Sequence, residues 1–180
     1  MGRHGDLPLQ MTACKIMTLQ KSSSLKSLKV KKLKIAIVMS RFNEAISRAL
    51  LKGAITGLLE SGVAEKDIGV VEVPGAFEIP LTALTAARSK KFNAIVCLGA
   101  IIRGQTPHFD YVCQAATQGI LRAQLETGLP MAFGILTTNT IDEALARARP
   151  GRENKGYEAA KVVIEMVEVV KKLKKKNSAI

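Results

Sequence analysis

One short stretch, Cys97–Tyr111, combines a proton carrier with a place for an anion. It opens as an apolar run of strand length, breaks at Arg103–Gly104 and restarts at Thr106–Pro107, residue types suited to a helix N-cap and first helical position. Free N–H groups at such a helix start suit a phosphate. His108 lies in the predicted first turn, and imidazole exchanges protons near neutral pH. The pattern indicates acid–base chemistry beside an anion, although an ordinary strand–helix connection with an exposed His would look the same.

Two phenylalanines stand where a loop would normally carry polar residues. Phe42 follows the apolar run Lys34–Ser40, and Phe77 lies in the segment Val73–Pro80, VPGAFEIP. An aromatic ring at such a place suits stacking on a flat heterocycle, but a ring tucked under a neighbouring helix is the simpler alternative. Glu78 sits in a predicted first helical turn, where it either binds a ligand or only complements the helix dipole.

The arginine, lysine and histidine residues further limit the kinds of reaction that the sequence could support. Arg147 and Lys155 flank a predicted helix break at Pro150, where they either clamp a phosphate or are simply solvated. The chain has two histidines, His4 and His108, so proton transfer by histidine in the body of the chain falls to His108. No serine triad, zinc-ligand spacing, Walker loop or dinucleotide fingerprint is visible in the sequence. We therefore predict neither a metal nor an organic cofactor.

Strand-length apolar runs alternate four times with helical patterns, which predicts an α/β fold with a parallel sheet and helices on both faces. In such sheets ligands bind beyond the carboxyl ends of the strands, so the distinctive loops should converge on one edge. The predicted strands are Lys34–Ser40, Ile68–Val73, Phe92–Ile102 and Met131–Thr137. The predicted helices are Glu44–Ser61, Phe77–Ser89, Pro107–Thr127, Ile141–Ala148 and Asn154–Lys175.

The net charge of +12 is confined to the ends of the chain. Residues 1–34 hold eight basic residues against Asp6 alone, residues 171–180 hold five lysines, and residues 35–170 are neutral overall. We predict a basic, disordered extension over residues 1–33, a single domain over residues 34–170 and a basic tail over residues 171–180. Solvated tails explain this charge more simply than nucleic-acid binding, which would show as salt-sensitive association.

Cysteine usage and hydropathy bear on the location. Three cysteines, odd in number and without metal spacing, favour a reducing compartment, and we predict a cytoplasmic protein. No apolar run reaches the ~18 residues of a membrane span. The acid-poor start of the chain also leaves a transit peptide open as an alternative.

Six motifs in order resemble the 6,7-dimethyl-8-ribityllumazine synthase family over about residues 34–170. They are SRFN at 40–43, VPGAFEIP at 73–80, GAIIRGQTPHFDYV at 99–112, FGILTT at 133–138, RA at 147–148 and NKGYEAA at 154–160. The resemblance implies a flavodoxin-like three-layer α/β/α sandwich with a four-stranded parallel sheet. It also implies an enzyme of riboflavin biosynthesis that needs no cofactor. The implied reaction condenses 5-amino-6-(D-ribitylamino)uracil with 3,4-dihydroxy-2-butanone 4-phosphate and releases phosphate and water.

The resemblance also implies a role for particular residues. His108 would be the general acid/base. The pyrimidine and its ribityl chain would be held by Phe42, Ala76, Phe77, Glu78, Ala100, Ile101, Ile102 and, from a neighbouring subunit, Phe133. The phosphate would be held by Gln105, Thr106, Arg147 and Lys155.

Relatives assemble as homopentamers, some as hollow icosahedral shells of twelve pentamers, with sites at subunit interfaces, and riboflavin synthase is a candidate partner. The short segment Arg149–Glu153 has the length typical of shell-forming members, but its sequence RPGRE departs from the usual glycine-rich one. Two other functions keep the same fold: a catalytically silent shell or receptor for flavin-like ligands, and a flavodoxin-like FMN-binding module. Neither would form lumazine.

Overall fold

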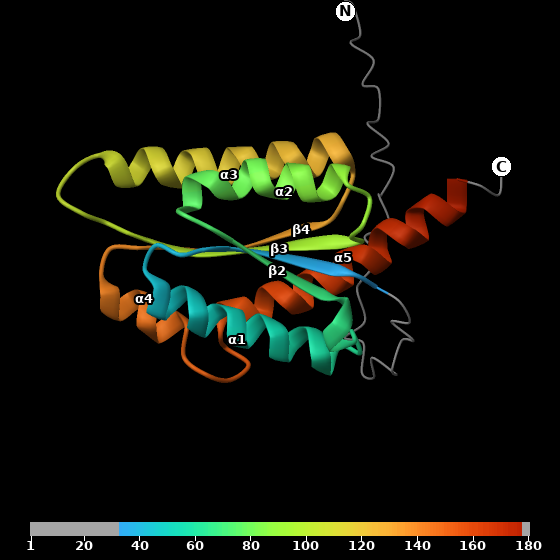
Figure 1. Ribbon diagram of the computed structural model, residues 1–180, viewed down its shortest axis with the longest axis horizontal. Coiled ribbons are helices and arrows are strands. Elements are labelled where there is room, and N and C mark those ends of the chain that lie inside the picture. Colours follow the sequence, from blue (N-terminus) through green and yellow to red (C-terminus); the bar gives the residue numbers. More distant parts are fainter. Residues whose placement is uncertain (1–32, 178–180) are drawn as a thin grey trace, which may run out of the picture.

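A four-stranded, all-parallel sheet of order β2-β1-β3-β4 organises the chain (Figure 1). The structure, a computed structural model, describes residues 33–177, so the extension predicted up to residue 33 lies almost entirely outside the described residues. The strands are β1 Ile35–Ser40, β2 Ile68–Val73, β3 Ala94–Ile102 and β4 Met131–Thr138. The predicted α/β class with a four-stranded parallel sheet is confirmed.

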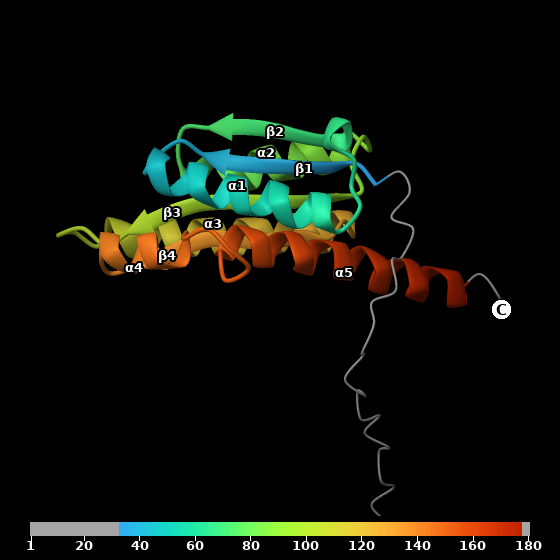
Figure 2. The same cartoon turned by 90° about the horizontal axis from the view of Figure 1, so that it is seen from below.

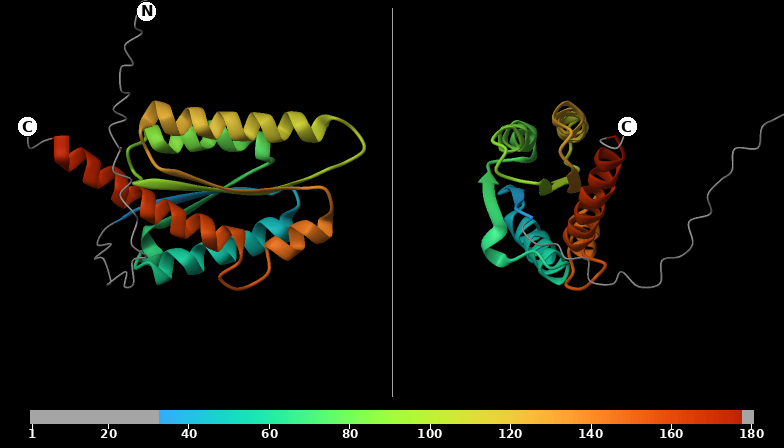
Figure 3. Two further views of the ribbon diagram at one scale, coloured as in Figure 1. Left: turned by 180° about the vertical axis from the view of Figure 1, so that it is seen from behind. Right: turned by 90° about the vertical axis from the view of Figure 1, so that its right-hand side faces the viewer.

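Helices cover both faces of the sheet, as predicted. Figures 1 and 3 show α2 and α3 on one face and α1, α4 and α5 on the other, while Figure 2 shows α5 running past the end of the sheet. The helices are α1 Glu44–Glu60, α2 Ile79–Arg88, α3 His108–Thr127, α4 Ile141–Arg147 and α5 Lys155–Asn177. Two single 3₁₀ turns, η1 Glu65–Asp67 and η2 Ala76–Glu78, precede β2 and α2.

Some predicted helix ends are wrong in detail. Pro107 lies just outside α3 rather than in its first position, and no side chain caps that start, so Thr106 is not the N-cap. The segment predicted as one helix from Phe77 is a 3₁₀ turn followed by α2, which places Pro80 in the first turn, where its missing N–H is harmless. Helix α5 ends at Asn177, two residues beyond the predicted Lys175, because lysine is a good helix former.

Two apolar cores sandwich the sheet, one on each face. In β1, Ile35, Ile37 and Met39 pack toward α1 and α5, whereas Ala36 and Val38 pack toward α2 and α3. Every residue of β1 is buried, because both of its faces are covered and it has a strand on either side. This explains why the strand is a continuous apolar run rather than an alternating one.

Helices α1 and α5 approach one another unusually closely. A Cβ added at Gly156 would lie 2.0 Å from the carbonyl oxygen of Leu50, and one added at Gly57 would lie 3.0 Å from the Cβ of Ala160. Glycine is needed at both positions because another side chain would push the helices apart. This contact fixes where α5 begins and therefore where Lys155 lies.

Candidate active site

The order of the sheet places a pocket between β1 and β3. The chain passes from β1 outward to β2 and then crosses to β3 on the other side, so the loops after β1 and β3 diverge and leave a crevice. A pocket of about 620 Å³ lies there. It is lined by Phe42, Gly75, Ala76, Phe77, Glu78, Ala100, Ile101, Ile102, Gly104, Thr106, His108, Phe109 and Val112, and we call it the ring pocket.

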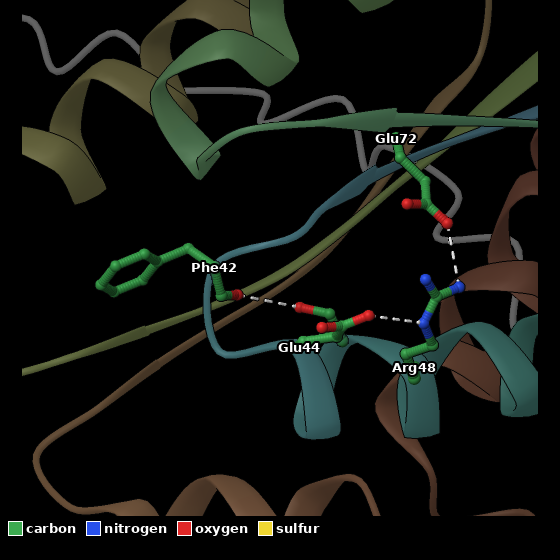
Figure 4. A network of polar contacts seen from close by, with 5 residues as sticks. Phe42, Glu44, Arg48 and Glu72 are labelled. Carbon is green, nitrogen blue, oxygen red and sulfur yellow. Dashed lines mark hydrogen bonds and ion pairs between the residues drawn. The ribbon is translucent and has the colours of Figure 1, made fainter.

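Hydrogen bonds fix the backbone of Phe42, whereas its aromatic ring is exposed. Its N–H donates to the carbonyl of Pro74 at 3.1 Å, and its own carbonyl accepts from Ser47 Oγ at 3.3 Å. The side chain is 71% exposed, and in Figure 4 the ring points away from the polar network at the start of α1. The ring therefore offers a face for stacking and is not tucked under a helix in this chain.

The start of α1 is fastened to the edge of the sheet beside Phe42. Arg48 Nε contacts Glu44 Oε1 at 3.1 Å, one turn earlier on the helix, and Arg48 Nη1 contacts Glu72 Oε1 on β2 at 2.9 Å (Figure 4). These carboxylates raise the pKa of the Arg48 guanidinium. The network ties α1 to β2 and so keeps the loop between β1 and α1 in place.

Asn43 is a positioning residue that sequence reasoning missed. Its backbone is left-handed, with φ of 57°, and its Nδ2 donates to the carbonyl of Ala100 at 2.8 Å. The bond joins the loop after β1 to the end of β3 across the ring pocket. The signal for it was an asparagine directly before a helix, since Asn is among the few residues that tolerate this conformation.

The turn after β2 brings Ala76, Phe77 and Glu78 to the same pocket. Phe77 is 63% exposed. Glu78 Oε2 accepts from the N–H of Gly75 at 2.8 Å, so the carboxylate stabilises its own turn. This contact favours the capping interpretation of Glu78 while leaving it at the wall of the pocket.

The loop from β3 to α3 supplies the polar side of the ring pocket. Thr106 and His108 line it, and His108 is the exposed first residue of α3. Gln105 is exposed in the same loop but is not among the residues that line the pocket. The structure thus brings the predicted proton carrier and both aromatic rings to one cavity.

Phe133, Arg147 and Lys155 lie elsewhere, in a second pocket of about 330 Å³ between β4 and α5, which we call the charged pocket. Lys155 Nζ contacts Glu158 Oε2 at 2.6 Å, and Arg147 Nη1 donates to the carbonyl of Glu143 at 2.9 Å. Within one chain these three predicted residues share a pocket with each other but not with His108.

Asn154 holds the junction that carries both cations. Its Nδ2 donates to the carbonyls of Ala148, at 2.8 Å, and of Arg149, at 3.1 Å, while its Oδ1 accepts from the N–H of Gly156 at 2.9 Å. The side chain is buried. One amide therefore satisfies backbone groups at the end of α4 and the start of α5, and sets Arg147 and Lys155 side by side.

Cys97, on β3, is not a reactive thiol. It is fully buried, and burial raises the pKa of its thiol to about 12. The thiolate, which is the nucleophilic form, is therefore unpopulated at neutral pH. Cys97 is therefore excluded as a nucleophile, whereas the titratable residues Glu78 and His108 line the ring pocket itself.

Residues 33–177 hold no helix long and apolar enough to cross a membrane. The same residues contain no group of three or more His, Cys, Asp and Glu side chains arranged to hold a metal ion.

Comparison with known proteins identifies the family. The model of the 6,7-dimethyl-8-ribityllumazine synthase family matches residues 32–171. A protein of that name from Syntrophus aciditrophicus (strain SB) is 50% identical over 143 residues, which cover 79% of this chain and 93% of the relative. Its namesake from Desulfatibacillum aliphaticivorans is 50% identical over 141 residues, covering 78% and 91%. The resemblance expected from the six sequence motifs is confirmed, and the chain belongs to the 6,7-dimethyl-8-ribityllumazine synthase family.

Proposed function

We propose that this chain carries out its family's condensation in the ring pocket, with His108 as the general acid/base. The family's reaction joins 5-amino-6-(D-ribitylamino)uracil to 3,4-dihydroxy-2-butanone 4-phosphate in riboflavin biosynthesis, giving 6,7-dimethyl-8-ribityllumazine, phosphate and water. The observation that carries the assignment is the meeting of His108, Phe42 and Phe77 in one cavity at the switch between β1 and β3.

The reaction asks for a group that both gives and takes protons. The amine of the pyrimidine adds to the ketone and water leaves to form a Schiff base, then phosphate leaves, and ring closure releases a second water. Each loss of water needs a proton delivered to a departing hydroxyl, and each attack by nitrogen needs a proton removed. An imidazole at neutral pH serves both needs, and His108 stands where the pocket meets the loop before α3.

The other predicted site residues form two groups, one that binds the pyrimidine and its ribityl chain and one that binds the phosphate. Phe42 stacks on the pyrimidine, while Phe77, Glu78 and the backbone of Ala76 and Ala100–Ile102 hold the ring edge and the ribityl chain. The N–H groups of Gln105 and Thr106, ahead of the α3 N-terminus, bind the phosphate, in keeping with the positive end of the helix dipole.

We further propose that the complete site forms between subunits of a homopentamer. No lysine or arginine is among the described residues that line the ring pocket, yet one substrate is a phosphate ester. Arg147, Lys155 and Phe133 of a neighbouring subunit would complete the site, since they gather in the charged pocket. The proposal extends to a cytoplasmic location, a shell of twelve pentamers and riboflavin synthase as a partner. Sedimentation distinguishes a free pentamer from the shell.

The His108→Ala variant tests the assignment of the proton carrier. We expect turnover, followed by the fluorescence of the lumazine product, to fall about 10²-fold or more. Unchanged turnover would reject His108 as the proton carrier, whereas an unaltered chain that forms no lumazine would favour the silent binding protein. Copurification with yellow flavin, without any lumazine formation, would favour an FMN-binding module instead.

Mixed oligomers test the shared site. Co-expression of His108→Ala chains with Arg147→Ala chains places an intact ring pocket beside an intact charged pocket at roughly one quarter of random interfaces. Activity should return to about that fraction although each variant alone is nearly inactive. Mixed oligomers no more active than the separate variants would show that each subunit builds its site alone.

A further inference from the structure

The loop between β3 and α3 has little packing of its own. It projects beyond the carboxyl edge of the sheet (Figures 1 and 2), and residues 103–108 are all exposed. A Cβ added at Gly104 would meet no atom within 4 Å. A loop this free would present its N–H groups to a phosphate in many arrangements, so something at its base must hold it.

Arg103, the first residue of this loop, makes an unusual set of contacts. Its Nη2 and Nη1 contact the two carboxylate oxygens of Asp110 at 2.8 and 3.3 Å, and its Nε donates to Asn139 Oδ1 at 3.1 Å. The guanidinium carbon lies 4.2 Å from the centre of the Phe109 ring, and the backbone N–H donates to the carbonyl of Thr138 at 2.9 Å. The guanidinium group of Arg103 thus makes hydrogen bonds along its edge and lies over the Phe109 ring with its face.

These contacts join the start of the loop to two other segments. Phe109 and Asp110 belong to the first turn of α3, directly after His108, and Asn139 lies in the connection from β4 to α4. The pair Arg103–Asp110 closes the loop at its base, and Asn139 anchors that base to the neighbouring strand end. Both ends of the segment Gly104–Thr106 are therefore held.

We propose that Arg103 is a positioning residue that clasps the phosphate-binding loop and fixes it relative to His108. The inference rests on the proposed function, because it takes this loop as the phosphate site. Arg103 is not among the residues that line the ring pocket, and its three nitrogens are already directed at Asp110 and Asn139. It acts on the loop geometry and does not itself bind the phosphate.

Arg103→Ala and Arg103→Lys test the role, with Arg88→Ala as the matched control. Arg88 forms the same kind of exposed pair with Glu126, near the far end of α3 and away from the pocket. We expect Arg103→Ala to raise the KM of the phosphate substrate by about tenfold and to leave the KM of the pyrimidine within about twofold. Lysine should recover little, because it lacks the planar fork. Arg88→Ala should change neither KM.

The Asp110→Asn variant distinguishes a positioning role of Arg103 from direct phosphate binding by Arg103. The measurement is competitive inhibition by inorganic phosphate, which should change in opposite directions in the two cases. If Arg103 positions the loop, loosening its partner weakens phosphate inhibition by about threefold. If Arg103 binds the phosphate itself, release from Asp110 tightens the inhibition and Arg103→Lys restores the KM. Either of those two results would overturn the inference, as would an Arg103→Ala variant indistinguishable from Arg88→Ala.

His108→Ala in the same assay keeps the two proposals apart. If His108→Ala abolishes turnover while Arg103→Ala behaves like the control, only the proposed positioning role of Arg103 is wrong. If His108→Ala leaves turnover intact, the assignment of His108 as the proton carrier fails, whereas an unaltered chain that forms no lumazine would overturn the proposed function together with the inference that rests on it.

Discussion

The ring pocket and the charged pocket are built in different ways. The ring pocket is made by the loops that follow β1, β2 and β3, together with the end of β3 and the start of α3, and aromatic rings and small residues dominate its wall. The charged pocket is made by side chains of β4, of the end of α4 and of the start of α5, including Arg147, Lys155 and Glu158. Phe42 and Phe77 therefore lie in a different pocket of this chain from Arg147 and Lys155.

The two pockets are also held by different means. Single hydrogen bonds made by exposed or half-exposed loop residues hold the ring pocket, such as Asn43 to the carbonyl of Ala100 on β3 and Glu78 to the N–H of Gly75. A buried amide, Asn154, and close helix packing at Gly156 hold the charged pocket. We expect damage to the charged pocket to affect folding as well as binding, and damage to the ring pocket to affect binding alone.

Removal of Asn154 should have the largest effect. Asn154→Ala leaves buried backbone groups at the α4–α5 junction without partners and should lower the free energy of unfolding by about 3 kcal/mol. Urea denaturation measures it. Asn139→Ala, which loses one exposed bond to Arg103, is the control and should cost under about 1 kcal/mol. Equal losses in the two variants would contradict the difference between the pockets.

Arg147→Ala should affect the phosphate ester and spare the pyrimidine. We expect kcat/KM for the phosphate substrate to fall about 10²-fold, because a charged donor to the departing phosphate is lost. Steady-state kinetics with each substrate varied in turn measures it. A matching rise in the KM of the pyrimidine would show that Arg147 itself, and not only Phe133 of the same pocket, acts on pyrimidine binding.

Phe42→Ala should weaken binding of the pyrimidine and spare the phosphate substrate, and its effect should be smaller than that of Arg147→Ala. Loss of the stacking face should weaken pyrimidine binding about tenfold and leave inhibition by inorganic phosphate unchanged. Because the ring is largely exposed in the chain, the free energy of unfolding should stay constant. Phe42→Leu keeps an apolar side chain without the flat ring and should recover only part of the affinity.

Treatment of the folded protein with a thiol reagent should have the smallest effect, because Cys97 is buried. Burial raises the pKa of its thiol to about 12, so iodoacetamide at pH 8 should leave Cys97 unmodified in the folded protein and label it in urea. The folded chain keeps a proton that the unfolded chain releases near pH 9. The associated stabilisation is therefore full below that pH and is lost as the pH rises toward 12. Rapid labelling of folded Cys97 would contradict the assigned burial.

Prediction from sequence succeeded where the signal was local. The four strands and their alternation with helices follow from the apolar runs, whereas for Phe42 and Phe77 the choice between stacking and packing stayed open until the structure showed both rings exposed. Asn43 was missed because its contact with Ala100 joins residues far apart in sequence. The ends of α2 and α5 were misplaced because proline and lysine are tolerated over several positions at helix ends.

The sequence by itself determined the parallel sheet, its covered faces and the residue types at each strand end, because these depend on hydrophobic periodicity and on turn chemistry. The tertiary structure alone decided that His108 shares a cavity with Phe42 while Arg147 and Lys155 gather at a separate one. Strand order and helix packing set those distances, and neither is written in the spacing of residues along the chain.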